Sequence, residues 1–166
     1  MQKYSVLLFS FLVCTCVFAD FNDDLQKYVT DEVSASHYIK RNYKYINTSN
    51  MFGDVEKFWA SKRGCCIDYA YATAYILQQH LGLLEVYTVS FHAKKLFEGH
   101  SVCIWNTPTG WKVSSNGKIR THFKSKEKAL HYINAEFNHR YEWAQIYTVA
   151  WEGYIYHSRS IEHITL

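Results

Sequence analysis

The sequence has little of what divides a chain into separate parts. It contains one proline, Pro108, and seven glycines among 166 residues, so it has no stretch typical of a flexible linker or a low-complexity segment. It also has no internal repeat. A chain of this length suits a single core, which commonly forms from about 100 to 200 residues. We therefore expect one domain.

An excess of charge of one sign is also lacking. The formal net charge is +3 with neutral histidine, and the basic residues are spread along the chain. A nucleic-acid-binding surface needs lysine and arginine gathered on one face. Charged residues make up 20% of the chain and apolar residues 48%, which excludes the charge-rich composition of a disordered protein. The composition predicts a packed globular domain that does not bind nucleic acid.

Long apolar runs are scarce, and the one that stands out lies at the N-terminus. Lys3 gives a weakly positive start, residues 6–13 are almost wholly apolar, and Ala19 is a small residue at the end of the segment. This pattern is typical of a secretory signal peptide over residues 1–19. The run is shorter than the roughly 20 apolar residues that a membrane-spanning helix needs. We expect a secreted or periplasmic domain, residues 20–166, with no stable membrane insertion; a retained N-terminal anchor is the alternative.

Cysteine occurs in an odd number outside that segment. Cys14 and Cys16 lie inside it, where lipid attachment is an alternative that lacks the usual small residue before the cysteine. Cleavage would leave Cys65, Cys66 and Cys103 in the mature chain. An odd number outside the cytosol means that at least one thiol is free or pairs between chains. The sequence thus indicates a reactive thiol, although a buried cysteine can equally be a small apolar core residue.

The hydrophobic pattern predicts helices first and strands after them. Residues 21–46 have apolar side chains three and four positions apart, which indicates one or two helices, and residues 52–60 indicate a short one. The clearest helix covers residues 66–81, with an apolar stripe that Gly82 ends. The remaining predicted elements are strands at 84–92, 99–105, 111–115, 118–123, 145–151 and 154–158, and a helix from 125 to about 137. This order predicts an α+β domain in which N-terminal helices and a buried helix pack on an antiparallel sheet.

The start of the 66–81 helix carries the residues with chemistry. Cys66 is its first residue, where the free amide groups of the first turn favour a thiolate. Gly64 precedes it and would leave space for a substrate backbone. Asp68 falls in the first turn, where a carboxylate bonds free amide groups, so we interpret it as structural. Cys66 is therefore the candidate nucleophile.

A histidine beyond that helix is the candidate base. A nucleophilic thiol needs a base within hydrogen-bond reach and a third group that orients the base. Of nine histidines, His100 stands out because of its place in the predicted order of elements. It lies at the start of the strand 99–105, which opens the hairpin that follows the helix 66–81 and the strand 84–92. The next strand ends in Ser115 and Asn116, and we favour Asn116 because its amide oxygen can accept an imidazole N–H. The predicted catalytic set is Cys66, His100 and Asn116, although each residue alone has an ordinary role in a core, a surface or a turn.

Together these motifs resemble the transglutaminase-like superfamily, and in particular the bacterial transglutaminase-like cysteine peptidases. The motifs that carry the resemblance are Gly64-Cys65-Cys66-Ile67-Asp68-Tyr69-Ala70, Leu81-Gly82, Gly99-His100-Ser101-Val102 and Gly110-Trp111-Lys112-Val113. The resemblance covers residues 52–120 and implies a papain/transglutaminase-like core. It places the family nucleophile on Cys66, the family histidine on His100, and the third family residue, normally Asp, on Ser115 or Asn116.

The resemblance implies a secreted or periplasmic cysteine peptidase of Cys-His-Asn type that needs no cofactor and acts on a protein or peptide. His100 would take the proton of Cys66, and the sulfur would attack an amide carbonyl to form a thioester that water or an amine resolves. The backbone N–H of Cys66 would stabilise the oxyanion, with Trp59 or Lys62 as second donor by proximity. The alternative is a catalytically decayed transglutaminase-like module that binds a protein or cell-envelope partner.

Cys65 and Cys103 have no role in that chemistry. A disulfide between them would tie the helix start to the His100 strand and leave Cys66 as the free thiol. The alternatives are that neither pairs, that Cys66 is bridged and Cys65 is reactive, or that the protein is a small disulfide-stabilised factor with Cys66 oxidised. A metal site is disfavoured, because cysteines that bind zinc are usually two to four residues apart rather than adjacent.

Overall fold

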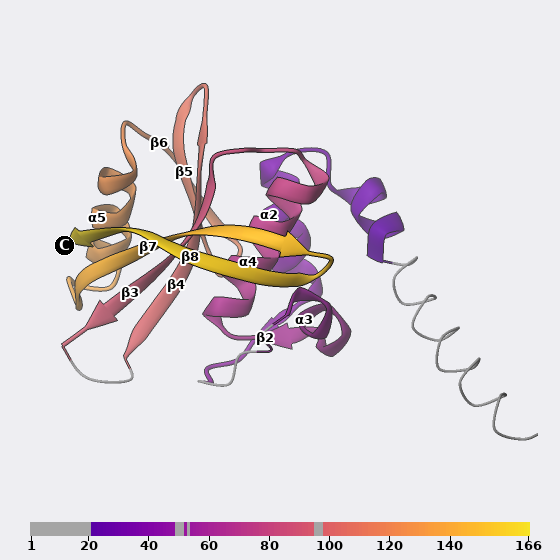
Figure 1. Ribbon diagram of the computed structural model, residues 1–166, viewed down its shortest axis with the longest axis horizontal. Coiled ribbons are helices and arrows are strands. Elements are labelled where there is room, and N and C mark those ends of the chain that lie inside the picture. The colour runs from indigo at the N-terminus through magenta and orange to yellow at the C-terminus, as the bar shows by residue number, and fades with distance from the viewer. Residues whose placement is uncertain (1–20, 49–51, 53, 95–97) are drawn as a thin grey trace, which may run out of the picture.

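The computed structural model describes residues 21–48, 52, 54–94 and 98–166. Helices and an antiparallel sheet form separate layers (Figure 1). The α+β class expected from the sequence is confirmed. The expected signal peptide lies outside the described residues, and within them no helix is long and apolar enough to cross a membrane.

The first half of the chain is helical. A helix over residues 21–28 is followed by α2 (Glu32–Asn42), α3 (Val55–Ser61) and α4 (Cys66–Tyr75), and α4 continues into a π-helical turn, η1 (Ile76–His80). Asp31 and Asp54 cap α2 and α3, because each side chain accepts a backbone N–H of its helix's first turn. The helix expected at 66–81 is confirmed, and Gly82 follows it at φ +69°, the conformation in which glycine commonly ends a helix.

The second half forms a six-stranded antiparallel sheet in the order β6-β5-β4-β3-β7-β8. Its strands are β3 (Val86–Ala93), β4 (Gly99–Thr107), β5 (Gly110–Ser115), β6 (Lys118–Phe123), β7 (Tyr141–Glu152) and β8 (Ile155–Thr165), with α5 (Lys126–Glu136) between β6 and β7. All the predicted strands are present. β7 and β8 are longer than predicted. Their ends could not be read from the sequence, because most side chains of β8 are exposed and no apolar alternation marks where the hairpin begins and ends.

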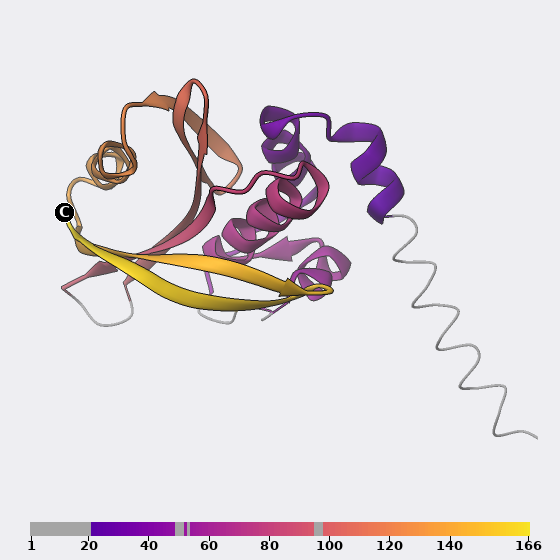
Figure 2. The same ribbon diagram turned by 45° about the horizontal axis from the view of Figure 1, so that its top comes forward.

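The sheet has an apolar core on each face. α4 and the N-terminal helices pack against the face that carries Cys103 and Trp105 of β4, whereas α5 packs against the face that carries Val102 and Ile104. Alternate residues of β4 therefore serve opposite layers, as the pleat of a strand requires. Figure 2 shows α4 and α5 on opposite sides of the strongly twisted sheet. The helix that begins with Cys66 is thus buried against the sheet, as predicted.

A short parallel strand pair precedes α4 and was not predicted. β1 (Lys44–Tyr45) pairs with β2 (Arg63–Gly64), and the backbone N–H of Ile46 donates to the carbonyl of Gly64. Strands of two residues leave no periodic pattern in a sequence. Because β2 leads directly into α4, this pair places Tyr45 next to the start of the helix.

Candidate active site

One buried carboxylate fixes the start of α4. Asp68 accepts the backbone N–H of Cys65 at 2.8 Å and the backbone N–H of Phe52 at 2.9 Å. The first bond satisfies a free amide at the helix start, and the second ties the helix to the segment before α3. Asp68 is only 6% exposed, and both of its oxygens are engaged with backbone. Its role is therefore structural, as predicted.

Gly64 is required by packing. A Cβ at this position would lie 2.6 Å from Cδ2 of Phe58 and 2.8 Å from both Cβ and Oδ2 of Asp68. Real Cβ contacts are not that short, so any side chain here would displace a neighbour. The glycine was expected to make room for a substrate backbone, and that expectation is corrected: the space beside it is filled by the protein's own side chains.

Cys66 is the first residue of α4 and is partly exposed, whereas Cys65 is buried. The pKa of the Cys66 thiol is lowered, chiefly because the Cys65 thiol donates a hydrogen bond to it. Burial acts in the opposite direction, but hydrogen bonding and positive charge from His100 and the backbone N–H of Ser101 add to the lowering. The pKa of Cys65 is raised, first by the same hydrogen bond, which holds its proton, and then by burial. Of the two adjacent thiols, Cys66 is therefore the one that ionises.

The start of α4 meets the part of β4 that extends beyond the end of β5. β4 pairs with β3 from Gly99 onward, but its pairing with β5 begins only at Cys103. Ser101 lies in this stretch of β4, and its backbone N–H contributes to the lowered pKa of the Cys66 thiol. Because β5 ends before it reaches this part of β4, Cys66 lies beside the strand that carries His100.

Contacts from β5 and α5 hold His100. Its Nε2 lies 2.8 Å from Oγ of Ser115 in a hydrogen bond. Its ring also packs on Phe137, with centroids 4.7 Å apart, and against Phe91 at 6.4 Å. His100 is 6% exposed, so the ring is oriented on several sides. With Nε2 engaged by Ser115, Nδ1 is the ring nitrogen left to interact with Cys66.

Ser115, and not Asn116, makes the hydrogen bond to the candidate base. Asn116 begins the tight turn into β6 at φ +48°, and Gly117 follows at φ +72°. These paired positive angles belong to the two-residue hairpin turn that Asn-Gly favours. The amide oxygen of Asn116 is buried and has no hydrogen-bond partner in the described part of the chain. The turn, rather than the imidazole ring, decides where this side chain lies.

Cys66 and His100 border the same pocket, which has a volume of about 360 Å³. This size is within the usual range of small-ligand sites. The described residues that line it are Tyr45, Asn47, Thr48, Cys65, Cys66, Ile67, Ser90, Phe91, His92, Glu98, Gly99, His100 and Ser101. Its rim is exposed at Tyr45, Glu98 and Gly99, so both solvent and an extended ligand can reach the thiol.

The two residues expected to supply a second oxyanion donor lie elsewhere. Trp59 is buried in the helical core and stacks on Phe21 at a centroid distance of 3.4 Å. The Nζ of Lys62 lies 5.1 Å from the ring centroid of Tyr43. Neither residue lines the pocket of Cys66. Nearness in sequence to the cysteine therefore did not identify a donor.

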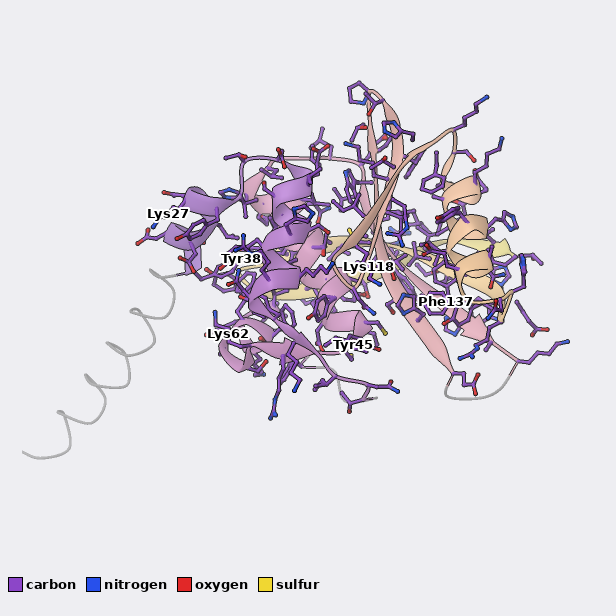
Figure 3. All side chains as sticks on the ribbon, turned by 180° about the vertical axis from the view of Figure 1, so that it is seen from behind. Lys27, Tyr38, Tyr45, Lys62, Lys118 and Phe137 are labelled. Atoms are coloured by element: carbon purple, nitrogen blue, oxygen red, sulfur yellow. The ribbon has the colours of Figure 1, made fainter. Side chains whose placement is uncertain are left out.

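Tyr45 and Asn47 line the pocket and were missed by the sequence analysis. Both follow from the β1–β2 pair, which brings residues 44–46 alongside the start of α4. The pKa of the Tyr45 phenol is raised, first by burial and then by the nearby Cys66 and Cys65. The raised pKa keeps the phenol of Tyr45, a residue labelled in Figure 3, protonated at neutral pH. No local pattern in the sequence predicted that Tyr45 would lie beside Cys66.

Cys65 and Cys103, considered above as a disulfide pair, are not bonded to each other in the structure. Cys65, Cys66 and Cys103 are all free thiols. Cys103 lies three residues beyond His100 on β4, a distance of about 10 Å along a strand. It is completely buried, and this burial raises its pKa, so it serves as a small apolar core residue. Among the described residues, no group of three or more His, Cys, Asp or Glu side chains could hold a metal ion.

Comparisons with protein-family models and with curated proteins find no match to this chain. The chemistry of the site is therefore inferred from its own residues.

Proposed function

We propose that this protein is a cysteine peptidase of the transglutaminase-like type, which forms a thioester at Cys66 with a peptide or side-chain amide. The observation that carries the proposal is the line of contacts from Cys66 to His100 to Ser115 at the start of a buried helix. A nucleophile, its base and a group that orients the base are what thiol acyl transfer needs. The start of α4 packed against an antiparallel sheet also agrees with a papain/transglutaminase-like core.

The first step creates and uses the thiolate. His100 takes the proton of the Cys66 thiol on Nδ1, while the Cys65 thiol and the N–H of Ser101 donate to the charged sulfur. The sulfur attacks the carbonyl carbon, and the electron pair of the C=O moves to oxygen. His100 then gives its proton to the leaving nitrogen, the C–N bond breaks, and a thioester remains on Cys66.

Two groups are our candidates for the donors to the oxyanion of that step. The backbone N–H of Cys66 belongs to the first turn of α4, where amides have no partner within the helix. The phenol of Tyr45 lines the same pocket and remains protonated. Removal of one such donor from acyl-transfer sites typically costs a hundredfold or more in rate. Tyr45 therefore replaces Trp59 and Lys62 as our second donor.

Hydrolysis completes the cycle. The exposed rim of the pocket admits water. His100 takes a proton from that water, the hydroxide attacks the thioester carbonyl, and the thiolate of Cys66 leaves with the sulfur's electron pair. We favour hydrolysis over transfer to an amine, because amine transfer needs a site that excludes water and the described rim of the pocket is exposed. We further propose, from the N-terminal segment, that the protein acts outside the cytosol.

An activated ester tests the proposal without knowledge of the natural substrate. The protein is mixed with p-nitrophenyl acetate, p-nitrophenol release is followed, and peptide mass spectrometry locates the acetyl group. We expect rapid acetylation of Cys66, no acetylation at that position in Cys66→Ala, and slow acetylation in His100→Ala. His131→Ala is the matched control, because His131 is exposed on α5 and does not line the pocket.

Two results would overturn it. Acetylation of Cys65 instead of Cys66 would show that the wrong thiol has been chosen. Acetylation of Cys66 at the same rate in the native and the urea-unfolded protein would show that the fold does not activate the thiol. The second result would favour the alternative of a catalytically decayed binding module, for which the neutral third residue, Ser115, is the supporting observation.

A further inference from the structure

A second pocket adjoins the residues that hold His100. It has a volume of about 370 Å³, and the described residues that line it are Ser115, Asn116, Lys118, Arg120, Glu136 and Phe137. Ser115 and Phe137 are also the two residues that hydrogen-bond and stack on the His100 ring. Lys118 and Phe137 are labelled in Figure 3. Ser115 and Phe137 thus connect the ring of His100 with this second pocket.

The second pocket carries an excess of positive charge. Arg120 is neutralised by Glu136, to which its Nε and Nη2 donate at 3.0 and 2.8 Å. Lys118 is exposed and forms no ion pair with any described residue. Glu136 is the one acidic residue among the described lining residues, so the charge of Lys118 is left without a partner.

A further cation stands at the turn beside this pocket. Gly117 packs so closely on α2 that a Cβ there would lie 2.8 Å from Cβ of Lys40. Lys40 is exposed and also forms no ion pair within the described residues. Lys40 and Lys118 thus flank the β5–β6 turn, and their field favours a negatively charged ligand.

We propose that this second pocket binds a carboxylate of the substrate, supplied by an acidic side chain or by the C-terminus of a peptide whose reacting carbonyl lies at Cys66. The inference rests on the proposed function, because Cys66 and His100 define where the reacting bond sits. Lys118 is the specificity-determining residue, and Ser115 and Phe137 place the pocket a short distance beyond the base. The protein would accordingly prefer acidic peptides.

Alkylating peptides of matched shape and different charge test this preference. The sulfur of Cys66 displaces iodide from an iodoacetyl group, so a C–S bond forms as the C–I bond breaks. The probes are iodoacetyl-Gly-Gly-Glu-amide, its Gln counterpart, and iodoacetyl-Gly-Gly-Gly with a free or an amidated C-terminus. Peptide mass spectrometry measures the labelling rate at Cys66. The ratio of the labelling rates of the acidic and the neutral probe measures the preference for a carboxylate. Comparison of the two acidic probes shows whether the carboxylate comes from a side chain or from the C-terminus.

We expect one of the acidic probes to react about threefold faster than its neutral counterpart, as suits a partly exposed ion pair. The ratio should fall to about one in 1 M salt, where charges are screened beyond about 3 Å. Lys118→Glu and Lys118→Met should both remove the preference. Lys124→Glu makes the same change of charge at the other end of β6, about 20 Å along the chain, and should keep it.

The outcomes separate this inference from the proposed function. Labelling of Cys66 with a ratio of one for both probe pairs, or a preference that survives Lys118→Glu, overturns the carboxylate site alone. A Cys66 that reacts with none of the four probes removes the nucleophile, and both the carboxylate site and the proposed function fail with it.

Discussion

Replacing Ser115 should lower the reactivity of Cys66 when the new residue is Ala and raise it when the new residue is Asp. In the structure the Oγ of Ser115 lies 2.8 Å from Nε2 of His100 and is a neutral partner for that ring. Ser115→Ala removes the partner, and Ser115→Asp provides a charged one. The second variant therefore adds a negative charge that the site lacks beside the ring of His100.

The size of the effect follows from the environment of the ring. A hydrogen bond between neutral groups contributes about 1 kcal/mol net, and one to a charged group roughly twice as much. The ring of His100 keeps its packing on Phe137 and Phe91 in either variant, so the loss is limited to the hydrogen bond. About 1 kcal/mol corresponds to a factor of about five in the population of the thiolate–imidazolium pair, or about 0.7 pH units.

The assay is the rate of Cys66 alkylation by iodoacetamide as a function of pH. In Ser115→Ala the midpoint should move up by about 0.7 pH units, and in Ser115→Asp it should move down by a similar amount. Ser115→Thr keeps the hydroxyl and should restore the wild-type profile. Asn116→Gly preserves the turn, because glycine also adopts the positive φ of this position, and should leave the profile unchanged.

The opposite pattern would refute the reasoning. If Asn116→Gly shifts the midpoint and Ser115→Ala does not, the orienting group is the one that the sequence suggested. If neither variant shifts it, His100 does not act on Cys66 through an oriented ring.

Three further changes test the supports of the site. Gly64→Ala should lower the free energy of unfolding by about 1–3 kcal/mol, because its Cβ would overlap Phe58, and a denaturant midpoint equal to that of the wild type would contradict this packing. Asp68→Asn should cost about 2 kcal/mol of stability, because an NH₂ group would face one of the backbone N–H groups that the carboxylate now accepts, and an unchanged urea denaturation curve would count against it. Tyr45→Phe should slow hydrolysis of the acetyl thioester about a hundredfold and leave alkylation of Cys66 unchanged, because alkylation forms no oxyanion; equal turnover by the variant would remove Tyr45 from the oxyanion site.

The elements that carry the site could be predicted because their patterns are local. The stripe of apolar residues in 66–81 and the alternation in β3 and β4 depend only on which face of each element is buried. The position of Cys66 at a helix start is likewise readable from a few neighbouring residues. These local patterns were enough to predict the helix that begins with Cys66 and the strand that carries His100.

The partner of His100 could not be chosen because strand register is not local. Ser114 lies opposite Cys103, so Ser115 falls on the opposite face from Ser114, toward His100. Ser114 instead contacts Ser36 of α2. A shift of one residue in this pairing would exchange the two serines, and nothing in the sequence of β5 fixes it.

Tyr45 was missed for a related reason. It reaches the site through a parallel pairing of two residues with Arg63 and Gly64, which lie far along the chain. Such a short pair has no periodicity in the sequence. The two strands are separated in the chain by α3, and the packing of α3 in the core brings them together. The sequence could not decide between a Cys65–Cys103 disulfide and free thiols for the same reason. Only the fold shows that Cys103 lies within the core while Cys65 interacts with Cys66.

The ionisation of Cys66 is the most direct test of the proposed chemistry. The measurement is a titration of thiolate absorbance at 240 nm, taken as the difference between the wild-type protein and Cys66→Ala. Because the pKa of Cys66 is lowered, the thiolate should already be present at neutral pH and should disappear only on acidification, well below the ordinary cysteine value of about 8.5. In His100→Ala the transition should move toward higher pH, since one source of the lowering is removed. Absorbance that appears only above about pH 8.5, at the same midpoint in both proteins, would contradict an activated nucleophile.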